Sequence, residues 1–275
     1  MTSSPSARGV WREVKPGRAL LDEVIDVTRA AGEEVLDVYA RGCAVHSKHD
    51  GSPVTEADER AHRLICSELE RVAPGVPVVS EEATGPTAGQ AAPSSFWLVD
   101  PLDGTKEFIA RNGEFTINVA LIEDGIAVLG VVYAPVSGAV FAGSPDTAAL
   151  VEDGAGRRAI SARRGSTERT TVVVSRRHGD QEGLERVVDG RPVGTLIRVG
   201  SSLKFCLLAA GRADLYPRLG TTMEWDTAAG DAVLRAAGGS VTDLEGRPLR
   251  YGKPGFENPH FIARGLDDVG VRRGG

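Results

Sequence analysis

The sequence predicts an α/β protein in which helices pack against β-strands. Residues 18–41 and 55–72 carry apolar side chains at helical spacing. Short apolar runs at 76–80 and 96–99 have the length of buried strands, and apolar residues largely alternate with polar ones through 116–143. These two periodicities in one chain indicate the mixed class, α/β (α+β layered).

Composition and charge narrow the classes of function. The 275 residues are 41% hydrophobic and 25% charged, as in soluble globular proteins, and this length allows one or two domains. A net charge of −6 argues against a large nucleic-acid-binding surface. No run approaches the roughly 20 apolar residues that span a bilayer. We therefore expect neither a nucleic-acid partner nor a membrane partner.

The N-terminus and the cysteines indicate a cytoplasmic protein. Residues 1–17 lack the apolar segment of a secretory signal and predict a disordered lead-in. The three cysteines are odd in number and widely spaced, which predicts reduced thiols rather than disulfides.

The first of the two predicted helices is expected to be mainly structural. Gly42 is a plausible end for the first, and a polar, turn-rich connection containing Lys48 follows it. The second helix opens at Thr55, and Asp58 stands three residues later, as in a capping box. From these residues alone, Asp58 is a capping side chain.

The most informative stretch follows the apolar run at 96–99. It reads Asp-Pro-Leu-Asp-Gly-Thr at 100–105. Proline fixes its own φ and favours an extended residue before it, and Gly104 permits a left-handed backbone. The stretch therefore predicts a strand end that holds two carboxylates beside a turn.

These carboxylates predict a cation site next to a phosphate site. Asp100 and Asp103, with the carbonyl of Leu102 between them, offer the hard oxygen ligands that suit Mg²⁺. Backbone N–H groups at Gly104 and Thr105, near the start of a helix, would attract phosphate. The alternative is an ordinary strand-to-helix turn with surface aspartates.

Two further acidic residues stand at the ends of predicted elements. Glu81 follows the strand at 76–80, and it would lie near Asp100 if the two strands are neighbours in one sheet. Asp226 lies at the start of a helix predicted over 224–237, among small residues that allow close backbone approach. The alternatives are an exposed loop for Glu81 and a favourable helix-dipole interaction for Asp226.

Beyond the antiparallel meander predicted at 116–143, the chain alternates loops and short elements. Residues 144–170 are polar and Arg-rich, which predicts a solvated loop. The elements expected after it are strands at 171–175 and 193–199, a helix at 202–210, and edge strands at Val241 and 261–263.

The junction before the helix at 202–210 is a candidate anion site. Gly-Ser-Ser at 200–202 presents N–H groups and hydroxyls at a helix N-terminus. Lys204 lies in the first turn, where it opposes the helix dipole unless an anion compensates. The alternative is a capped helix with an exposed lysine.

Two of these stretches resemble the signatures of a known family. Residues 100–105 and 225–230 are similar to the two signatures of the inositol monophosphatase superfamily, which are Mg²⁺-dependent, lithium-sensitive phosphomonoesterases. They stand in the family's order, and the resemblance runs from about residue 20 to about residue 264. Lys-Glu-Phe at 106–108 resembles the 3′(2′),5′-bisphosphate nucleotidase branch.

The resemblance implies a fold and a division of the chain. The fold would be an inositol monophosphatase/fructose-1,6-bisphosphatase-like α/β/α/β sandwich. An N-terminal half at 18–143 would carry the metal-binding motifs. A C-terminal half at 144–275 would carry the substrate contacts and the last metal ligand.

The resemblance also implies a set of site residues. The metal ligands would be Glu81, Asp100, the Leu102 carbonyl, Asp103 and Asp226, around two or three Mg²⁺ ions that Mn²⁺ could replace. The catalytic residues would be Glu81, Asp58 and Thr105, which align the attacking water, with Lys48 in a loop near the metals. The substrate contacts would be Asp103, Gly104, Thr105, His178, Ser201, Lys204, Arg218 and Asp226.

The function implied by the resemblance is hydrolysis of a small-molecule phosphate. The favoured reaction removes the 3′-phosphate of adenosine 3′,5′-bisphosphate to give AMP, by attack of a metal-activated water. One alternative is an inositol monophosphatase or another sugar or nucleoside phosphate monophosphatase. A second is a phosphate-metabolite-binding regulator without turnover. The oligomeric state would be monomer or homodimer.

Overall fold

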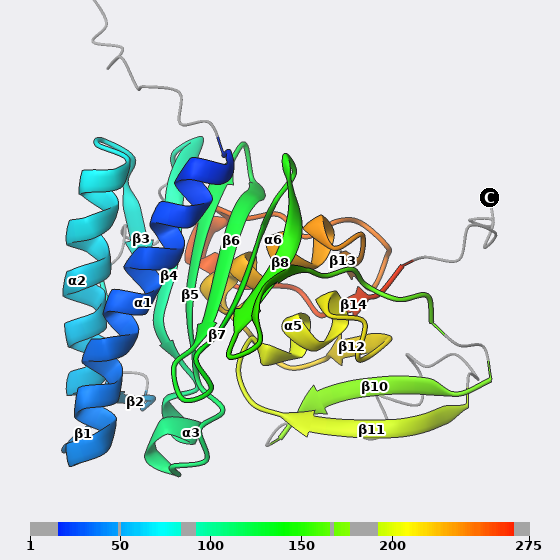
Figure 1. The fold of residues 1–275 in the computed structure, drawn as a ribbon, viewed down its shortest axis with the longest axis horizontal. Helices are drawn as coiled ribbons and strands as arrows, with labels where there is room; N and C mark the ends of the chain where they lie inside the picture. Colours follow the sequence, from blue (N-terminus) through cyan, green and yellow to red (C-terminus); the bar gives the residue numbers. More distant parts are fainter. Residues whose placement is uncertain (1–15, 49–50, 84–91, 166–167, 177–191, 267–275) are drawn as a thin grey trace, which may run out of the picture.

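The computed structural model describes residues 16–48, 51–83, 92–165, 168–176 and 192–266. Its elements stack in four layers, helices, sheet, helices and sheet, as Figure 1 shows from left to right. This arrangement confirms the α/β/α/β sandwich that the family resemblance implies.

The outer helical layer consists of α1 (Arg18–Arg41) and α2 (Glu56–Val72). Each helix buries one apolar stripe, including Leu21 and Val35 on α1 and Ile65 on α2, against the first sheet. Asp58 and Thr55 form the predicted capping box at the start of α2.

The first sheet has seven strands in chain order, β3 to β9. They are β3 (Val78–Ser80), β4 (Ser95–Asp103), β5 (Thr116–Glu123), β6 (Ile126–Ala134), β7 (Ala139–Ser144), β8 (Thr147–Asp153) and β9 (Gly156–Ala159). β3 and β4 are parallel, and all other neighbours are antiparallel, which confirms the meander.

A bulge interrupts β4 at its functional end. Asp100 pairs with Asn118 of β5 and Asp103 pairs with Thr116, so β4 has one residue more than its partner over this interval. Residues three apart on a regular strand point to opposite faces. The extra residue reverses this, and Asp100 and Asp103 therefore share the face that looks away from α1 and α2.

The inner helical layer lies between the two sheets and consists of α5 (Leu203–Ala209) and α6 (Ala228–Ala236). A short 3₁₀ turn, η1 (Glu224–Asp226), precedes α6. Small residues let α6 approach both neighbours closely. A Cβ on Gly130 of β6 would lie 2.3 Å from the Ala229 carbonyl oxygen, and one on Gly230 would lie 2.5 Å from the Phe205 ring.

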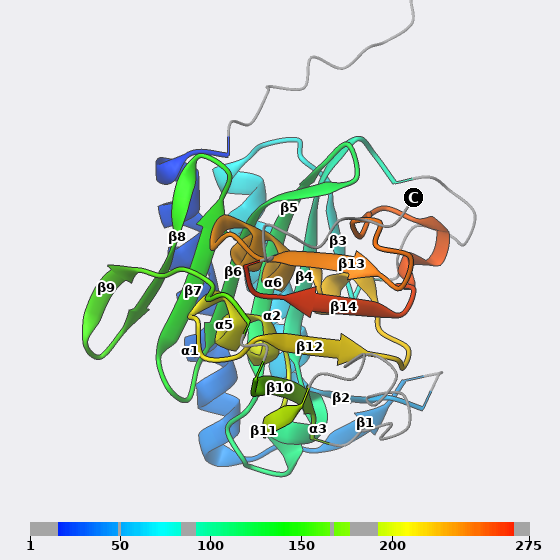
Figure 2. The same ribbon diagram turned by 90° about the vertical axis from the view of Figure 1, so that its right-hand side faces the viewer.

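The second sheet has five strands and faces the viewer in Figure 2. Its order is β11 (Val193–Val199), β10 (Thr170–Ser175), β12 (Leu215–Arg218), β14 (Phe261–Arg264) and β13 (Ser240–Asp243). The smaller elements are β1 (Val45–Ser47) paired with β2 (Pro53–Thr55), the short helix α3 (Thr105–Ile109) and the 3₁₀ turn η2 (Pro254–Phe256).

Two predictions about elements are wrong. The polar segment at 144–170 contains β8 and β9. β8 buries Ala149, Leu150 and Val151, whereas β9 extends the sheet by pairing with β8 and every one of its residues is exposed. The strand at 261–264 is not an edge, since β12 and β13 pair with its two sides. Among the described residues, no helix is both long enough and apolar enough to cross a membrane.

Candidate active site

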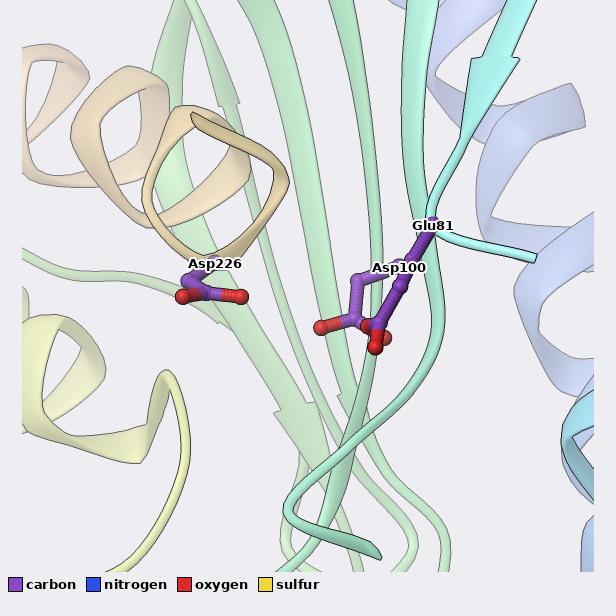
Figure 3. Close-up of side chains that lie close together, drawn as sticks. All are labelled: Glu81, Asp100 and Asp226. Atoms are coloured by element: carbon purple, nitrogen blue, oxygen red, sulfur yellow. The ribbon is translucent and has the colours of Figure 1, made fainter. Parts of the chain in front are cut away.

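Three carboxylates from three separate elements converge between the first sheet and α6. Glu81 directly follows β3, whose parallel pairing with β4 aligns Ser80 with Val99 and so brings Glu81 beside Asp100. Asp226 arrives from η1 on the opposite side, and Figure 3 shows it facing the other two. One carboxylate oxygen from each residue lies within 4.8 Å of the others. We call Glu81, Asp100 and Asp226 the acidic cluster.

Asp103 lies next to this cluster and is held by neutral donors. Its Oδ2 accepts hydrogen bonds from the Ser202 N–H at 2.6 Å and the Ser202 hydroxyl at 2.8 Å. Longer contacts come from Asn118 Nδ2 at 3.3 Å and Thr116 Oγ1 at 3.4 Å. Its charge is close enough to the cluster to raise the pKa values of Asp100 and Asp226.

Burial and mutual repulsion make the cluster difficult to ionise without a counter-charge. Burial, then the charges of Glu81, Asp103 and Asp226, raises the pKa of Asp100 well above its usual value. Burial, with a further contribution from Asp103, raises the pKa of Asp226 to about 8. The cluster therefore has too much negative charge in a small, poorly solvated volume.

The donor set fits a hard divalent cation. The cluster offers only carboxylate oxygens, the ligand type that Mg²⁺ and Mn²⁺ prefer. Burial and mutual repulsion raise the pKa values of Asp100 and Asp226, and a bound cation would offset that repulsion. These two observations support metal binding at this place.

One side chain already places positive charge beside the cluster. Lys48 Nζ donates to Glu81 Oε1 at 2.8 Å and to Glu82 Oε1 at 2.6 Å. Burial opposes the charged form of Lys48, but the two glutamates outweigh it and raise its pKa. Burial raises the pKa of Glu81, and Lys48 lowers it in part.

Asp58 and Thr105 meet at the edge of the same site. The Thr105 hydroxyl lies 3.3 Å from Asp58 Oδ1 and 3.3 Å from the Leu102 carbonyl oxygen, so its single proton has two alternative acceptors. Asp58 Oδ2 accepts from the Thr55 N–H at 2.8 Å and the Thr55 hydroxyl at 2.7 Å. Burial raises the pKa of Asp58 to about 6, although these Thr55 hydrogen bonds oppose the rise.

A pocket of about 150 Å³ opens beside the cluster. Asp103 and Asp226 line it together with three basic residues, Lys106, Lys204 and Arg218. Burial lowers the pKa of Lys204 to about 8, although Asp103 counteracts the change. The pocket thus combines acidic residues with basic ones, which is the charge pattern expected for a cation and an anion held side by side.

The other predicted substrate residues lie at several places. Gly104 caps α3 with a left-handed φ of 94°, and it lines the pocket with Ser201. The Ser201 carbonyl accepts a hydrogen bond of 2.5 Å from Lys204 Nζ. Arg218 donates to the Thr221 carbonyl at 2.9 Å. His178 lies outside the described residues.

The whole-chain comparison agrees with this geometry. The family model described as "Inositol monophosphatase family" matches residues 18–267. The chain belongs to the inositol monophosphatase family. That match includes the acidic cluster, the pocket and both sheets.

Several family members resemble the chain over nearly its whole length. The 3′(2′),5′-bisphosphate nucleotidase CysQ of Escherichia coli strain K12 is 46% identical over 245 residues, which is 88% of this chain and 98% of that protein. The crystal structure of CysQ from Bacteroides thetaiotaomicron has a TM-score of 0.78 at 36% identity, covering 91% of this chain and 98% of that one. Thermotoga maritima IMPase has a TM-score of 0.73 at 26% identity, covering 89% and 91%.

Two residues that hold Asp103 were not predicted to do so: Asn118 was not singled out, and Ser202 was placed only in the candidate anion site at 200–202. Asn118 and Ser202 both contact Asp103, and they contact each other. Asn118 offered a signal, because it is the one polar residue between Ile117 and Glu123 of an otherwise apolar strand. Ser202 stood in the candidate anion site at 200–202, but nothing in the sequence connected it with Asp103.

Proposed function

We propose that this chain is a Mg²⁺-dependent 3′(2′),5′-bisphosphate nucleotidase that removes the 3′-phosphate of adenosine 3′,5′-bisphosphate to give AMP. The observation that carries the proposal is the acidic cluster beside a pocket lined by Lys204 and Arg218. Relatives at 46% identity, covered over 98% of their length, are named as 3′(2′),5′-bisphosphate nucleotidases. A nucleotide with two phosphates suits a site that can bind a cation-linked phosphate and a second anionic group.

The cation would be held by Glu81, Asp100, Asp226 and Asp103, with the Leu102 carbonyl as a further oxygen. When bound, Mg²⁺ supplies positive charge that polarises the phosphoryl group, lowers the pKa of a water and stabilises the leaving oxygen. We infer two or three ions, because the carboxylates carry more negative charge than one ion neutralises. Mn²⁺ would substitute, since it accepts the same ligands.

The protein's own residues would orient the attacking water. The Thr105 proton is directed to Asp58 Oδ1 or to the Leu102 carbonyl. The Thr105 oxygen is therefore free to accept a hydrogen bond from water through its lone pairs. Glu81 would accept the second hydrogen of the same water. Two acceptors at fixed positions would align its oxygen with the phosphorus atom.

The substrate would extend from the cluster into the pocket. N–H groups of Gly104 and Thr105 would hold oxygens of the phosphate that reacts. Lys204, Arg218 and Ser201 would bind the rest of the nucleotide, with the second phosphate near Lys204 and Arg218. His178 is retained as a further proposed contact.

The proposal also includes the compartment. Cys43, Cys66 and Cys206 are free thiols. Free thiols support the cytoplasmic location expected from the sequence, because reducing conditions maintain them.

Steady-state kinetics test the proposed substrate. Phosphate release is measured with adenosine 3′,5′-bisphosphate, 3′-AMP and inositol 1-phosphate, each with Mg²⁺ and with EDTA. We expect the highest kcat/KM for the bisphosphate, and no release in EDTA. A preference for inositol 1-phosphate would favour the inositol monophosphatase alternative. Absence of release from every substrate would favour the regulator.

Variants of the pocket make the assay sharper. Lys204→Met and Arg218→Met should each raise KM for the bisphosphate by about tenfold or more, since each removes a charged partner of the second phosphate. KM for 3′-AMP should change much less. Arg63→Met is the matched control, because Arg63 lies exposed on α2 and contacts Glu59. Equal effects on both substrates would contradict the assignment of the second phosphate.

A further inference from the structure

We propose that Ser202 is a positioning residue that orients Asp103 for cation binding and links the acidic cluster to the turn that lines the pocket. The inference rests on the proposed function, because it treats Asp103 as a metal ligand. Ser202 is 1% exposed, so its polar atoms depend on protein partners.

Ser202 contacts both the Asp103 side chain and the main chain of Asp226. Its N–H and its hydroxyl both reach Asp103 Oδ2, at 2.6 and 2.8 Å. Its hydroxyl oxygen also lies 3.0 Å from the main-chain carbonyl oxygen of Asp226. A serine hydroxyl has a single proton, so Asp103 and Asp226 are alternative acceptors. The contact with Asp103 Oδ2 is the shorter of the two, at 2.8 Å against 3.0 Å, so we assign the hydroxyl proton to the bond with Asp103.

Asn118 completes this contact from β5. Its Nδ2 donates to Ser202 Oγ at 2.8 Å and lies 3.3 Å from Asp103 Oδ2. The hydroxyl of Ser202 therefore accepts one hydrogen bond and donates another, which leaves it a single orientation. Among the described residues, every hydrogen bond to the Asp103 side chain reaches Oδ2. Oδ1 is the oxygen left for a cation.

The residue immediately before Ser202 has an unusual backbone conformation. Ser201 has a φ of 51°, in the left-handed region that a residue with a side chain adopts at a cost of about 1 kcal/mol or more. The N–H of the next residue, Ser202, donates to Asp103 from this turn. Ser201 and Lys204 line the pocket from the same turn, so a ligand that shifts this turn also shifts the donors of Asp103. Cation affinity and nucleotide affinity should therefore be coupled, and coupling of this kind is reciprocal.

The test measures Mn²⁺ binding to the full chain by isothermal titration calorimetry, without substrate. Ser202→Ala should weaken the affinity by about tenfold, as loss of a hydrogen bond to a metal ligand commonly does. Asn118→Leu should weaken it in the same direction. The loss of Mn²⁺ affinity in the double variant should be smaller than the product of the two single losses, because both residues act on one oxygen of Asp103. Ser144→Ala is the matched control: Ser144 is a buried serine of β7 whose hydroxyl bonds Thr147.

A kinetic readout separates positioning from general loss of structure. The Mg²⁺ concentration for half-maximal activity should rise by about tenfold in Ser202→Ala, with most of kcat recovered at saturating Mg²⁺. Mn²⁺ affinity within twofold of wild type in Ser202→Ala would overturn the inference. If Ser202→Ala does not fold, Asn118→Leu decides the matter by the same criterion.

Asp103→Asn distinguishes failure of this inference from failure of the proposed function. If Asp103→Asn binds Mn²⁺ as well as the wild type, Asp103 is not a ligand, and the proposed metal site is wrong. If Asp103→Asn binds weakly and Ser202→Ala binds normally, the metal site stands and the role of Ser202 is refuted.

Discussion

Replacing Asp226 with asparagine should have opposite effects on stability and on activity. Asparagine keeps an oxygen that can accept the Met223 N–H, which lies 2.8 Å from Asp226 Oδ2. It removes the charge that the cluster repels. We expect the metal-free protein to become more stable, while metal binding and phosphate release are lost.

The magnitude follows from the raised pKa of Asp226. A free aspartate ionises near pH 4, whereas burial and Asp103 raise the pKa of Asp226 to about 8. At pH 7 Asp226 is ionised in the unfolded chain, whereas the folded protein disfavours its ionised form. This difference lowers the free energy of unfolding by about 4 kcal/mol at most. Asp226 is only partly buried, so we expect about 2 kcal/mol. For a chain of this size that corresponds to a rise of about 5 °C in Tm.

The assay is thermal unfolding in EDTA and in Mg²⁺, at pH 7. The Tm of the wild type should rise on addition of Mg²⁺. The Tm of Asp226→Asn should already be higher in EDTA, and Mg²⁺ should raise it little further. Its kcat should fall at least about a hundredfold. Asp231→Asn is the control: Asp231 is buried on α6 and accepts from Tyr251 at 2.9 Å, and this variant should keep the Mg²⁺ response. The reasoning is refuted if Asp226→Asn melts below the wild type in EDTA, or keeps the full Mg²⁺ response.

Three further outcomes are expected. Because the folded-state pKa of Asp226 is raised to about 8, the metal-free protein should lose stability as pH rises from about 4 to 8. The Tm gain from Mg²⁺ should grow over the same range. A Tm in EDTA that does not change with pH would contradict this. Thr105→Val should lower kcat about a hundredfold while Thr105→Ser retains activity, and equal rates for both would exclude a role for the hydroxyl. Lys48→Met should destabilise the metal-free protein by roughly 1 kcal/mol and enlarge the Mg²⁺ response, measured by the same melts; unchanged melts would show that its pairs with Glu81 and Glu82 contribute nothing.

Local patterns were sufficient for most elements. The helices at 18–41 and 55–72 bury wide apolar stripes, and a helical period of this length has no other explanation. The capping box at Thr55 is a contact between residues three apart, so it can be read directly from the chain. The hairpin of β8 and β9 was missed because the apolar run at 148–151 is only four residues long within a polar segment, and because the exposed β9 has no apolar period.

Some residues of the site were likewise identifiable from the sequence, and others were not. The sequence identified Glu81, Asp100, Asp103 and Asp226 by type and by resemblance, and it placed Glu81 beside Asp100 on the condition that their strands pair. It did not identify Asn118, and it did not connect Ser202 with Asp103. Both residues act by holding Asp103, and that contact depends on the pairing of β4 with β5 and on the packing of the inner helical layer.

By itself, the sequence determined the α/β class, the family and the acidic residues that make a cation site chemically reasonable. Only the tertiary structure decided that these residues meet. Asp100 and Asp103 share a face because a bulge against β5 breaks the alternation of β4. Asp226 reaches them because Gly130 and the small residues of α6 let that helix pack close to the sheet. Side-chain alternation and helical period are local properties, whereas the partner of a strand and the layer beneath a helix are set by distant parts of the chain.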